Sequence, residues 1–247
     1  NLQQRAATEL GENYTSEEYD AWNQRRLTNE REDREVAREA VRKSLAVLKN
    51  KNNLLPLSKN IRNLHVAGLG ANDIGMQCGG WTMEWQGKLG DITEGTTILD
   101  AIKSTVSDKT VVSYSKDGSN SQNADVAIVV IGEKPYAEGL GDDGELVLSK
   151  EDLLVIKNIQ KNNIPFVVIM LSGRPLMISD QIDNWDAFIA AWLPGTEGQG
   201  VADIIFGNNK PTGKLSFTWP KNINQIPIDS EDSNKEALFN YNFGLTY

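Results

Sequence analysis

The residues best suited to chemistry lie together in one short loop. Residues 132–139 have the sequence Gly-Glu-Lys-Pro-Tyr-Ala-Glu-Gly. Carboxyl groups can donate or accept protons in catalysis when they are held beside the reacting atoms. We take Glu138 as the first candidate for a catalytic acid in a cluster of five carboxylates: Glu133, Glu138, Asp142, Asp143 and Glu145.

The segment before this loop predicts where the loop lies. Residues 124–131, Ala-Asp-Val-Ala-Ile-Val-Val-Ile, are typical of a buried strand. In open α/β sheets the ligand binds beyond the carboxyl ends of the strands. We therefore expect the carboxylate-rich loop at the ligand-binding edge of a sheet, together with the other loops that follow predicted strands: 70–95, 172–175 and 193–198.

The loop at 70–95 is long and rich in glycine, and long loops in compact domains usually have a function. It carries Trp81 and Trp85, four residues apart. A flat indole ring can pack against the C–H face of a pyranose, and aromatic side chains commonly line binding pockets. We expect at least one of the two to contact a sugar. The alternative is that one or both are buried anchors of the loop.

Predicted strands alternate with predicted helices along the chain. The alternation predicts an α/β fold, a three-layer sandwich in which helices cover both faces of a mostly parallel sheet. The predicted helices are 33–49, 97–106, 149–161 and 197–206. The predicted strands are 64–69, 110–114, 126–131, 166–171 and 187–192, with 214–219 as a further candidate.

Composition excludes several classes of function. A net charge of −9 argues against nucleic acid or an anionic membrane as a partner, since both require basic patches. Cys78 is the only cysteine, which excludes an intrachain disulfide and a cysteine zinc site. His65 is the only histidine, which argues against a Ser-His-Asp triad, and we expect both residues to be packed. No apolar run approaches the roughly 18 residues of a membrane span.

Two nucleotide-binding signals fail on inspection. Gly68-Leu69-Gly70 begins like a dinucleotide fingerprint, but Asp73 occupies the third glycine position. The segment 207–214 has five residues between its glycines where a P-loop has four, and Leu215 follows it instead of a hydroxyl residue. The sequence therefore predicts neither a cofactor nor a metal.

Several motifs, in order, resemble the second, C-terminal domain of glycoside hydrolase family 3, most closely its β-glucosidases and β-glucan exohydrolases. The resemblance covers residues 31–247 and is carried by 38–57, 78–87, 132–138, 171–175, 191–200 and 243–247. Residues 1–30 are expected to be a linker or arm that packs on another domain, with Trp22 as its buried anchor. Because the chain starts without Met or a signal-peptide core, we expect it to be an interior part of a longer polypeptide.

The resemblance implies a sandwich with about six strands packed on a separate (β/α) barrel. It also implies retaining hydrolysis of β-glucosides or oligosaccharides through two carboxylates. By this resemblance Glu138 matches the catalytic acid/base of the family, and Glu133 is the alternative. Trp85 falls on an aromatic residue of the outer sugar subsite, with Trp81 beside it. In the intact site, apolar cover from Trp85 and Tyr136, together with the charge of the nucleophile, is expected to raise the pKa of Glu138.

The nucleophile of this family is a barrel aspartate, commonly within Ser-Asp-Trp, and that tripeptide does not occur here. The nearest string, Asp183-Asn184-Trp185, has the wrong context. We therefore expect the chain alone to be inactive and its partner to be the barrel. A non-catalytic carbohydrate-binding or structural α/β module is the alternative.

Overall fold

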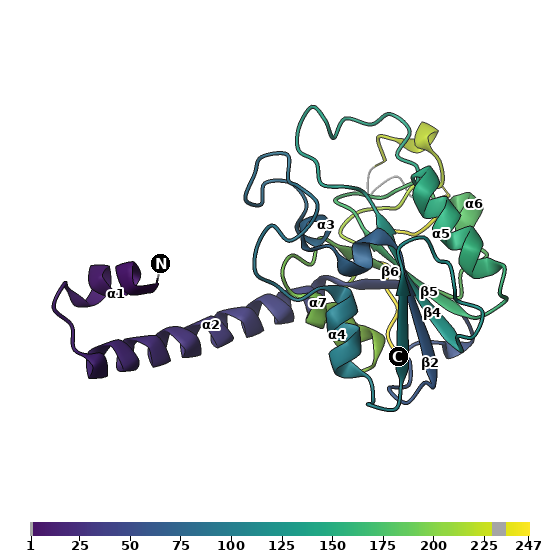
Figure 1. Ribbon diagram of the computed structural model, residues 1–247. Coiled ribbons are helices and arrows are strands. Elements are labelled where there is room, and N and C mark those ends of the chain that lie inside the picture. The colour runs from purple at the N-terminus through teal and green to yellow at the C-terminus, as the bar shows by residue number, and fades with distance from the viewer. Residues whose placement is uncertain (1, 229–235) are drawn as a thin grey trace. The chain divides into compact units, whose positions relative to one another are not determined.

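Figure 1 shows a computed structural model of the chain, in which residues 2–228 and 236–247 are described. The chain forms two compact units, Asn1–Glu39 and Ala40–Tyr247. The boundary between them falls inside the long helix α2 (Ser16–Ser44).

The first unit contains α1 (Leu2–Leu10) and most of α2. Thr15 and Glu18 begin α2 with a reciprocal cap, since the Glu18 N–H donates to the Thr15 hydroxyl while the Glu18 carboxylate accepts from the Thr15 N–H. Trp22 is buried and donates from Nε1 to Glu9 Oε2 at 2.8 Å. The hydrogen bond links α2 to α1 within this unit.

The second unit is built on a six-stranded sheet with the order β1-β6-β5-β4-β2-β3. All neighbouring strands are parallel except β1, which runs antiparallel to β6 at one edge. The strands are β1 (Ala46–Asn50), β2 (Asn63–Ala67), β3 (Val111–Ser115), β4 (Val126–Gly132), β5 (Phe166–Leu171) and β6 (Ala187–Trp192).

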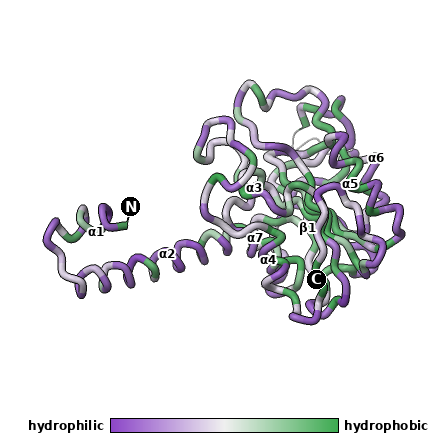
Figure 2. The backbone as a smooth tube through the Cα atoms, in the orientation of Figure 1, coloured by the Kyte–Doolittle hydropathy of each residue, from purple (hydrophilic) through white to green (hydrophobic). Residues whose placement is uncertain are grey.

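Helices cover both faces of the sheet, which confirms the predicted three-layer fold (Figure 1). α4 (Ile98–Thr105) and α7 (Gly198–Ile205) pack on one face. α5 (Lys150–Gln160) and α6 (Ser179–Ile182) pack on the other. Figure 2 shows hydrophobic residues concentrated in the sheet and largely hydrophilic residues along α2. The short helices are α3 (Ile74–Cys78), η1 (Lys51–Asn53), η2 (Leu69–Asn72) and η3 (Ile223–Gln225).

The prediction of one helix over 33–49 is wrong at both ends, because the helix begins at Ser16 and stops at Ser44, after which the chain enters β1. Leu45 and Leu48 fit a helical repeat, but the whole run from Leu45 to Leu48 is buried, as a strand covered on both faces requires. Trp192 Nε1 donates to the Ser44 carbonyl at 3.1 Å and satisfies the helix end. Lys49 instead donates to the carbonyls of Ile182 and Asp183.

The candidate strand at 214–219 is also wrong. Leu215 and Trp219 are buried, but they pack on the α5 face of the sheet. Their backbones pair locally with the C-terminal segment, where Leu215 N–H donates to Phe243 O and Trp219 N–H donates to Phe239 O. The apolar residues that suggested a strand belong to a covering loop.

The order of the strands creates a switch point in the sheet. From β2 the chain moves outward to β3 and then returns past β2 to β4. Loops on either side of such a reversal diverge and leave a crevice at the carboxyl ends of the strands. Here the diverging loops are those that follow β2 and β4, which carry the tryptophans and the carboxylates.

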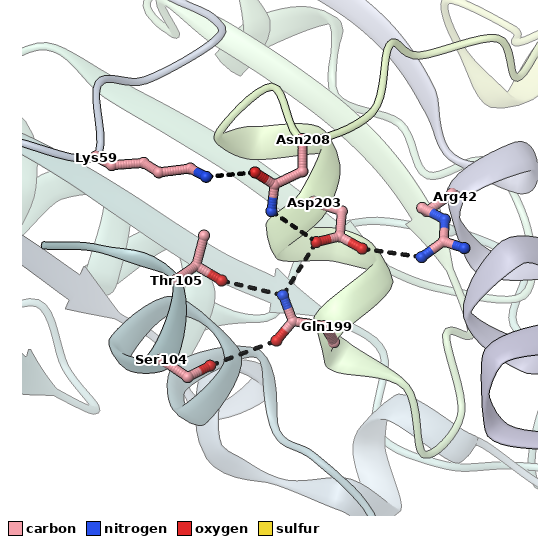
Figure 3. Close-up of polar contacts among 7 residues, drawn as sticks. All are labelled: Arg42, Lys59, Ser104, Thr105, Gln199, Asp203 and Asn208. Atoms are coloured by element: carbon pink, nitrogen blue, oxygen red, sulfur yellow. Dashed lines mark hydrogen bonds and ion pairs between the residues drawn. The ribbon is translucent and has the colours of Figure 1, made fainter. Parts of the chain in front are cut away.

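A polar network at α7 ties three helices together (Figure 3). Asp203 is buried and accepts hydrogen bonds from Arg42 in the last turn of α2, from Gln199 and from Asn208, at 2.9–3.0 Å. Gln199 also donates to Thr105 in α4. Burial alone would raise the pKa of Asp203, but these hydrogen bonds and the Arg42 charge outweigh burial and lower it.

Replacing Asp203 by Ala should therefore lower the free energy of unfolding by about 2–3 kcal/mol, because it leaves the Arg42 guanidinium and two amides without their shared acceptor. Urea unfolding at neutral pH measures the loss. Asp108→Ala, in an exposed turn, is the matched control and should change stability by less than about 0.5 kcal/mol. A loss at Asp203 no larger than this would contradict the role of the network.

Candidate active site

Two loops meet at the switch point, and we name them by their contents. The tryptophan loop is residues 79–90, after β2, and the acid loop is residues 133–143, after β4. Their backbones touch at Gly80, where a Cβ atom would lie only 2.0 Å from the Tyr136 carbonyl oxygen. A side chain at this position would force the loops apart, so the approach requires glycine.

The tip of the tryptophan loop projects into solvent. Trp81 and Trp85 are 69% and 54% exposed, and their rings meet edge to face with centroids 6.3 Å apart. The Trp81 N–H donates to the Trp85 carbonyl at 2.9 Å and closes the tip. The alternative in which these tryptophans are buried anchors is wrong, and both rings are open to a ligand.

Glu138 lies beside this tip. Trp85 Nε1 donates to Glu138 Oε2 at 2.9 Å, and the carboxylate is exposed. The hydrogen bond from Trp85, with a further one from Trp81, holds the pKa of Glu138 below its ordinary value. The raised pKa expected for the intact site, with the nucleophile present, stays a prediction, because in this chain Trp85 presents its N–H to the carboxylate and Tyr136 packs elsewhere.

Glu133, the rival carboxylate, is held in an ion pair. Arg174 donates to Glu133 Oε1 from Nη2 at 2.7 Å and from Nε at 3.0 Å, and the Tyr136 hydroxyl donates to Oε2 at 2.9 Å. Burial and the Glu133 charge raise the pKa of Tyr136 to about 12, so its phenol stays protonated as a donor. Both oxygens of Glu133 are thus engaged inside the acid loop.

Arg174 joins the loops that follow β4 and β5. Besides Glu133, it donates from Nη1 to the Gly141 carbonyl at 2.7 Å. Its guanidinium also lies 4.5 Å from the centroid of the Tyr136 ring, within cation–π range. Arg174 thus both binds a carboxylate and braces the neighbouring loops.

Asp73, which interrupts the dinucleotide fingerprint, and Gln77 bind backbone groups around α3, just before the tryptophan loop. Asp73 accepts from the N–H of Met76, which caps α3, and from the N–H of Gly90 at the end of the loop. Gln77 is fully buried, and its amide accepts from the Ile98 N–H while it donates to the Gly195 carbonyl. A buried glutamine has no local sequence signature, because its partners come from loops far away in the chain.

Cys78 and His65 take the packed positions expected of them. The Cys78 thiol is free and buried, and burial raises its pKa. His65 is buried on β2, with ring nitrogens 2.8 Å and 3.0 Å from the hydroxyls of Ser113 and Ser115 on β3. Burial lowers the pKa of His65 and favours its neutral form.

A cavity of about 830 Å³ lies between the acid loop and α5, with Asp152 in its wall. Asp152 is only 7% exposed, and the Ser149 hydroxyl, which caps α5, donates to it at 2.8 Å. Burial raises the pKa of Asp152 to about 6, against opposing hydrogen bonds from Ser149 and the Gly132 backbone. At neutral pH Asp152 is therefore a buried carboxylate, although its surroundings favour the protonated carboxyl group.

The pH dependence of stability should reveal this charge. In the native state Asp152 binds its proton near pH 6, whereas the unfolded chain binds it near 3.8, so Asp152 stabilises the fold below pH 4 and loses that contribution as pH rises through 6. Asp152→Asn should thus gain about 2–3 kcal/mol relative to the wild type between pH 4 and pH 8.

Urea unfolding of both proteins across this range measures the difference. His65 acts in the opposite direction, since its lowered pKa costs stability as pH falls below about 6.5, but it contributes equally to both proteins and cancels. A difference between variant and wild type that stays flat with pH would contradict the assignment.

Among the described residues, no group of three or more His, Cys, Asp or Glu side chains is placed to hold a metal ion. Within the same part of the chain, every helix is too short or too polar to cross a membrane.

The site combines an exposed aromatic pair with an exposed carboxylate at the edge of a three-layer α/β sandwich. The chain matches the glycosyl hydrolase family 3 C-terminal domain over residues 45–247 and belongs to that family. The resemblance seen in the motifs is thereby confirmed.

Named relatives and solved structures agree with this assignment. The chain is 32% identical to the lysosomal beta glucosidase of Dictyostelium discoideum over 243 residues, which cover 87% of this chain and 30% of that protein. It is 31% identical to a beta-xylosidase of Formosa agariphila, covering 87% and 34%. The crystal structure of an exo-1,3/1,4-beta-glucanase from a Pseudoalteromonas species superposes with a TM-score of 0.82 and 44% identity, covering 87% and 28%. The chain thus spans about a third of the length of its relatives.

Proposed function

We propose that this chain supplies the general acid/base and an outer aromatic subsite to a retaining β-glucosidase whose nucleophile lies on a (β/α) barrel outside residues 1–247. The observation that carries the proposal is the 2.9 Å hydrogen bond between Trp85 and Glu138 at the open switch point of the sheet. It brings a carboxylate and a flat aromatic ring side by side, an arrangement that suits protonation of a glycosidic oxygen beside a bound sugar.

The chemistry divides between the two carboxylates of a retaining enzyme. The barrel nucleophile attacks the anomeric carbon while Glu138 protonates the leaving oxygen, and Glu138 then removes a proton from the water that releases the sugar. Trp85 donates its N–H in the plane of the ring, which leaves the ring face available to the departing sugar. Trp81 widens this aromatic platform.

Glu138 suits this role better than Glu133. An acid/base must exchange protons with substrate and water, and Glu138 is exposed at the surface. Glu133 is fixed by hydrogen bonds from an arginine and a tyrosine, and it orders the acid loop. The rival carboxylate therefore acts as a brace.

The lowered pKa of Glu138 supports inactivity of this chain alone. The Trp85 hydrogen bond favours the ionised form of Glu138, whereas the first step of the reaction requires the protonated form. A second carboxylate from the barrel, placed across the sugar, would raise the pKa by repulsion between like charges. In the intact site the barrel would thus supply the nucleophile and also raise the pKa of Glu138, so that Glu138 could act as the acid.

The named relatives favour terminal β-D-glucosyl residues of oligosaccharides or glucosides as the substrate. A glucosidase and an exo-glucanase are among them, and the exo-glucanase has the higher identity of the two, 44%. We further propose that residues 31–247 form the family domain and that residues 1–30 are an arm that packs on the barrel.

The experiment is a hydrolysis assay with p-nitrophenyl β-glucoside and with a β-linked glucose disaccharide. This chain alone should show no turnover, and addition of a polypeptide that carries the barrel should restore it. Binding of the disaccharide without turnover in the combined sample would overturn the proposal in favour of a non-catalytic carbohydrate-binding module.

A further inference from the structure

We infer that Gln86 is a positioning residue, whose side-chain amide fixes the backbone of the acid loop at Ala137–Glu138 and so brings the Glu138 carboxylate to the Trp85 indole. The catalytic meaning of this role rests on the proposed function of Glu138. The geometry stands independently of that function.

Gln86 uses both ends of its amide on consecutive residues of the acid loop. Its Nε2 donates to the Glu138 carbonyl at 3.0 Å, and its Oε1 accepts from the Ala137 N–H at 2.9 Å. The amide thereby holds a backbone donor and a backbone acceptor as a neighbouring strand would. A carboxylate could not donate to the carbonyl, and an apolar side chain could make neither bond.

Close backbone packing surrounds this amide and leaves the loops little freedom to slide. Gly80 lies on the Tyr136 carbonyl, and a Cβ atom at Gly87 would lie 2.6 Å from Pro135 Cβ. These van der Waals contacts keep the two loops close together, but they do not by themselves fix which residues lie opposite one another. The two hydrogen bonds of Gln86 select one register between the loops.

The rest of the acid loop is held by other means. Arg174 binds the Gly141 carbonyl at the far end, and the Gly141 N–H donates to the Ala137 carbonyl within the turn. These bonds define the shape of the turn without connecting Glu138 to the tryptophan loop. Because Trp85 and Gln86 are adjacent, fixing the Glu138 backbone at Gln86 also places its carboxylate within reach of the Trp85 indole.

The test follows the Trp85 indole N–H by NMR in this 247-residue chain, across pH 3–8. In the wild type this resonance should report the ionisation of Glu138, with a midpoint below the ordinary glutamate range. In Gln86→Met, which keeps the length of the side chain and loses both hydrogen bonds, the midpoint should rise to the ordinary range and the pH-dependent shift should shrink. Gln86→Ala should behave in the same way.

Gln181→Ala, at a glutamine of α6 outside both loops, is the control and should titrate like the wild type. The buried indole resonances of Trp185 and Trp219 should stay unchanged in every variant, which shows that the core is folded. A wild-type titration of Trp85 in Gln86→Met would overturn the inference, because packing alone would then suffice.

A second arm separates this inference from the proposed function. In the full-length enzyme, Gln86→Met should lower kcat/KM for substrates with poor leaving groups by roughly 10- to 100-fold and leave activated aryl glucosides nearly unaffected. If the Trp85 titration changes and this pattern does not appear, the positioning role stands and the acid/base role of Glu138 fails.

Discussion

Replacing Glu138 by Ala in the full-length enzyme should slow the hydrolysis of substrates with poor leaving groups by about 10²–10⁴-fold, the usual contribution of a general acid. Alkyl glucosides and disaccharides depend on protonation of the departing oxygen, whereas 2,4-dinitrophenolate leaves without it. The effect should therefore grow as the pKa of the leaving group rises. Measured kcat/KM over a series of aryl glucosides gives this dependence as a slope.

Two further carboxylates make the experiment specific. Glu145→Ala removes an exposed carboxylate close to the acid loop and should leave the slope unchanged. Glu133→Ala should lower activity for all substrates to a similar degree, because it loosens the loop that Glu133 braces. A steep slope for Glu133→Ala and a flat one for Glu138→Ala would reverse the assignment.

Arg174→Ala should have the largest effect on stability, a loss of about 3–4 kcal/mol in the free energy of unfolding. The substitution leaves the Glu133 carboxylate with only the Tyr136 hydroxyl and removes the donor to the Gly141 carbonyl. It also removes the cation that packs on the Tyr136 ring. Guanidinium unfolding of this chain measures the loss.

A double-mutant cycle tests whether the charge pair is the cause. Adding Glu133→Gln to Arg174→Ala should recover part of the lost stability, because the partly buried carboxylate no longer lacks its cation. Arg62→Ala, at an exposed position, is the control and should change stability by less than about 0.5 kcal/mol. Strictly additive effects of the two substitutions would show that Arg174 acts through Gly141 and Tyr136 and not through Glu133.

Local chemistry explains which parts of the fold could be predicted. The runs that became β4 and β5 are apolar at every position, and only a strand covered on both faces buries such a run. Ser149 caps α5 as expected, because capping depends on residues within one turn. β1 was not predicted, since Leu45 and Leu48 satisfy a helical repeat equally well and only pairing with β6 selects the strand.

In the candidate site, too, the features set by local sequence could be predicted and those set by distant partners could not. The motif placed Glu138 and the tryptophans in neighbouring loops, and the structure brings Trp85 to 2.9 Å from the carboxylate. The lowered pKa of Glu138 in this chain could not be predicted, because its direction depends on whether the indole presents its face or its N–H. The partners of Gln77 and Gln86 lie 19 to 118 residues away in the chain, beyond the reach of any local pattern.

The last turn of α2 bears on how this domain should be excised for expression. The family match begins at residue 45, but Val41 belongs to the hydrophobic core and Arg42 binds Asp203. The Ser44 carbonyl is the acceptor for Trp192 at the end of β6. A fragment cut at Leu45 would discard these three anchors while keeping every strand. The compact unit that contains the sheet starts at Ala40, five residues before the family match, so a fragment for expression should include the last turn of α2.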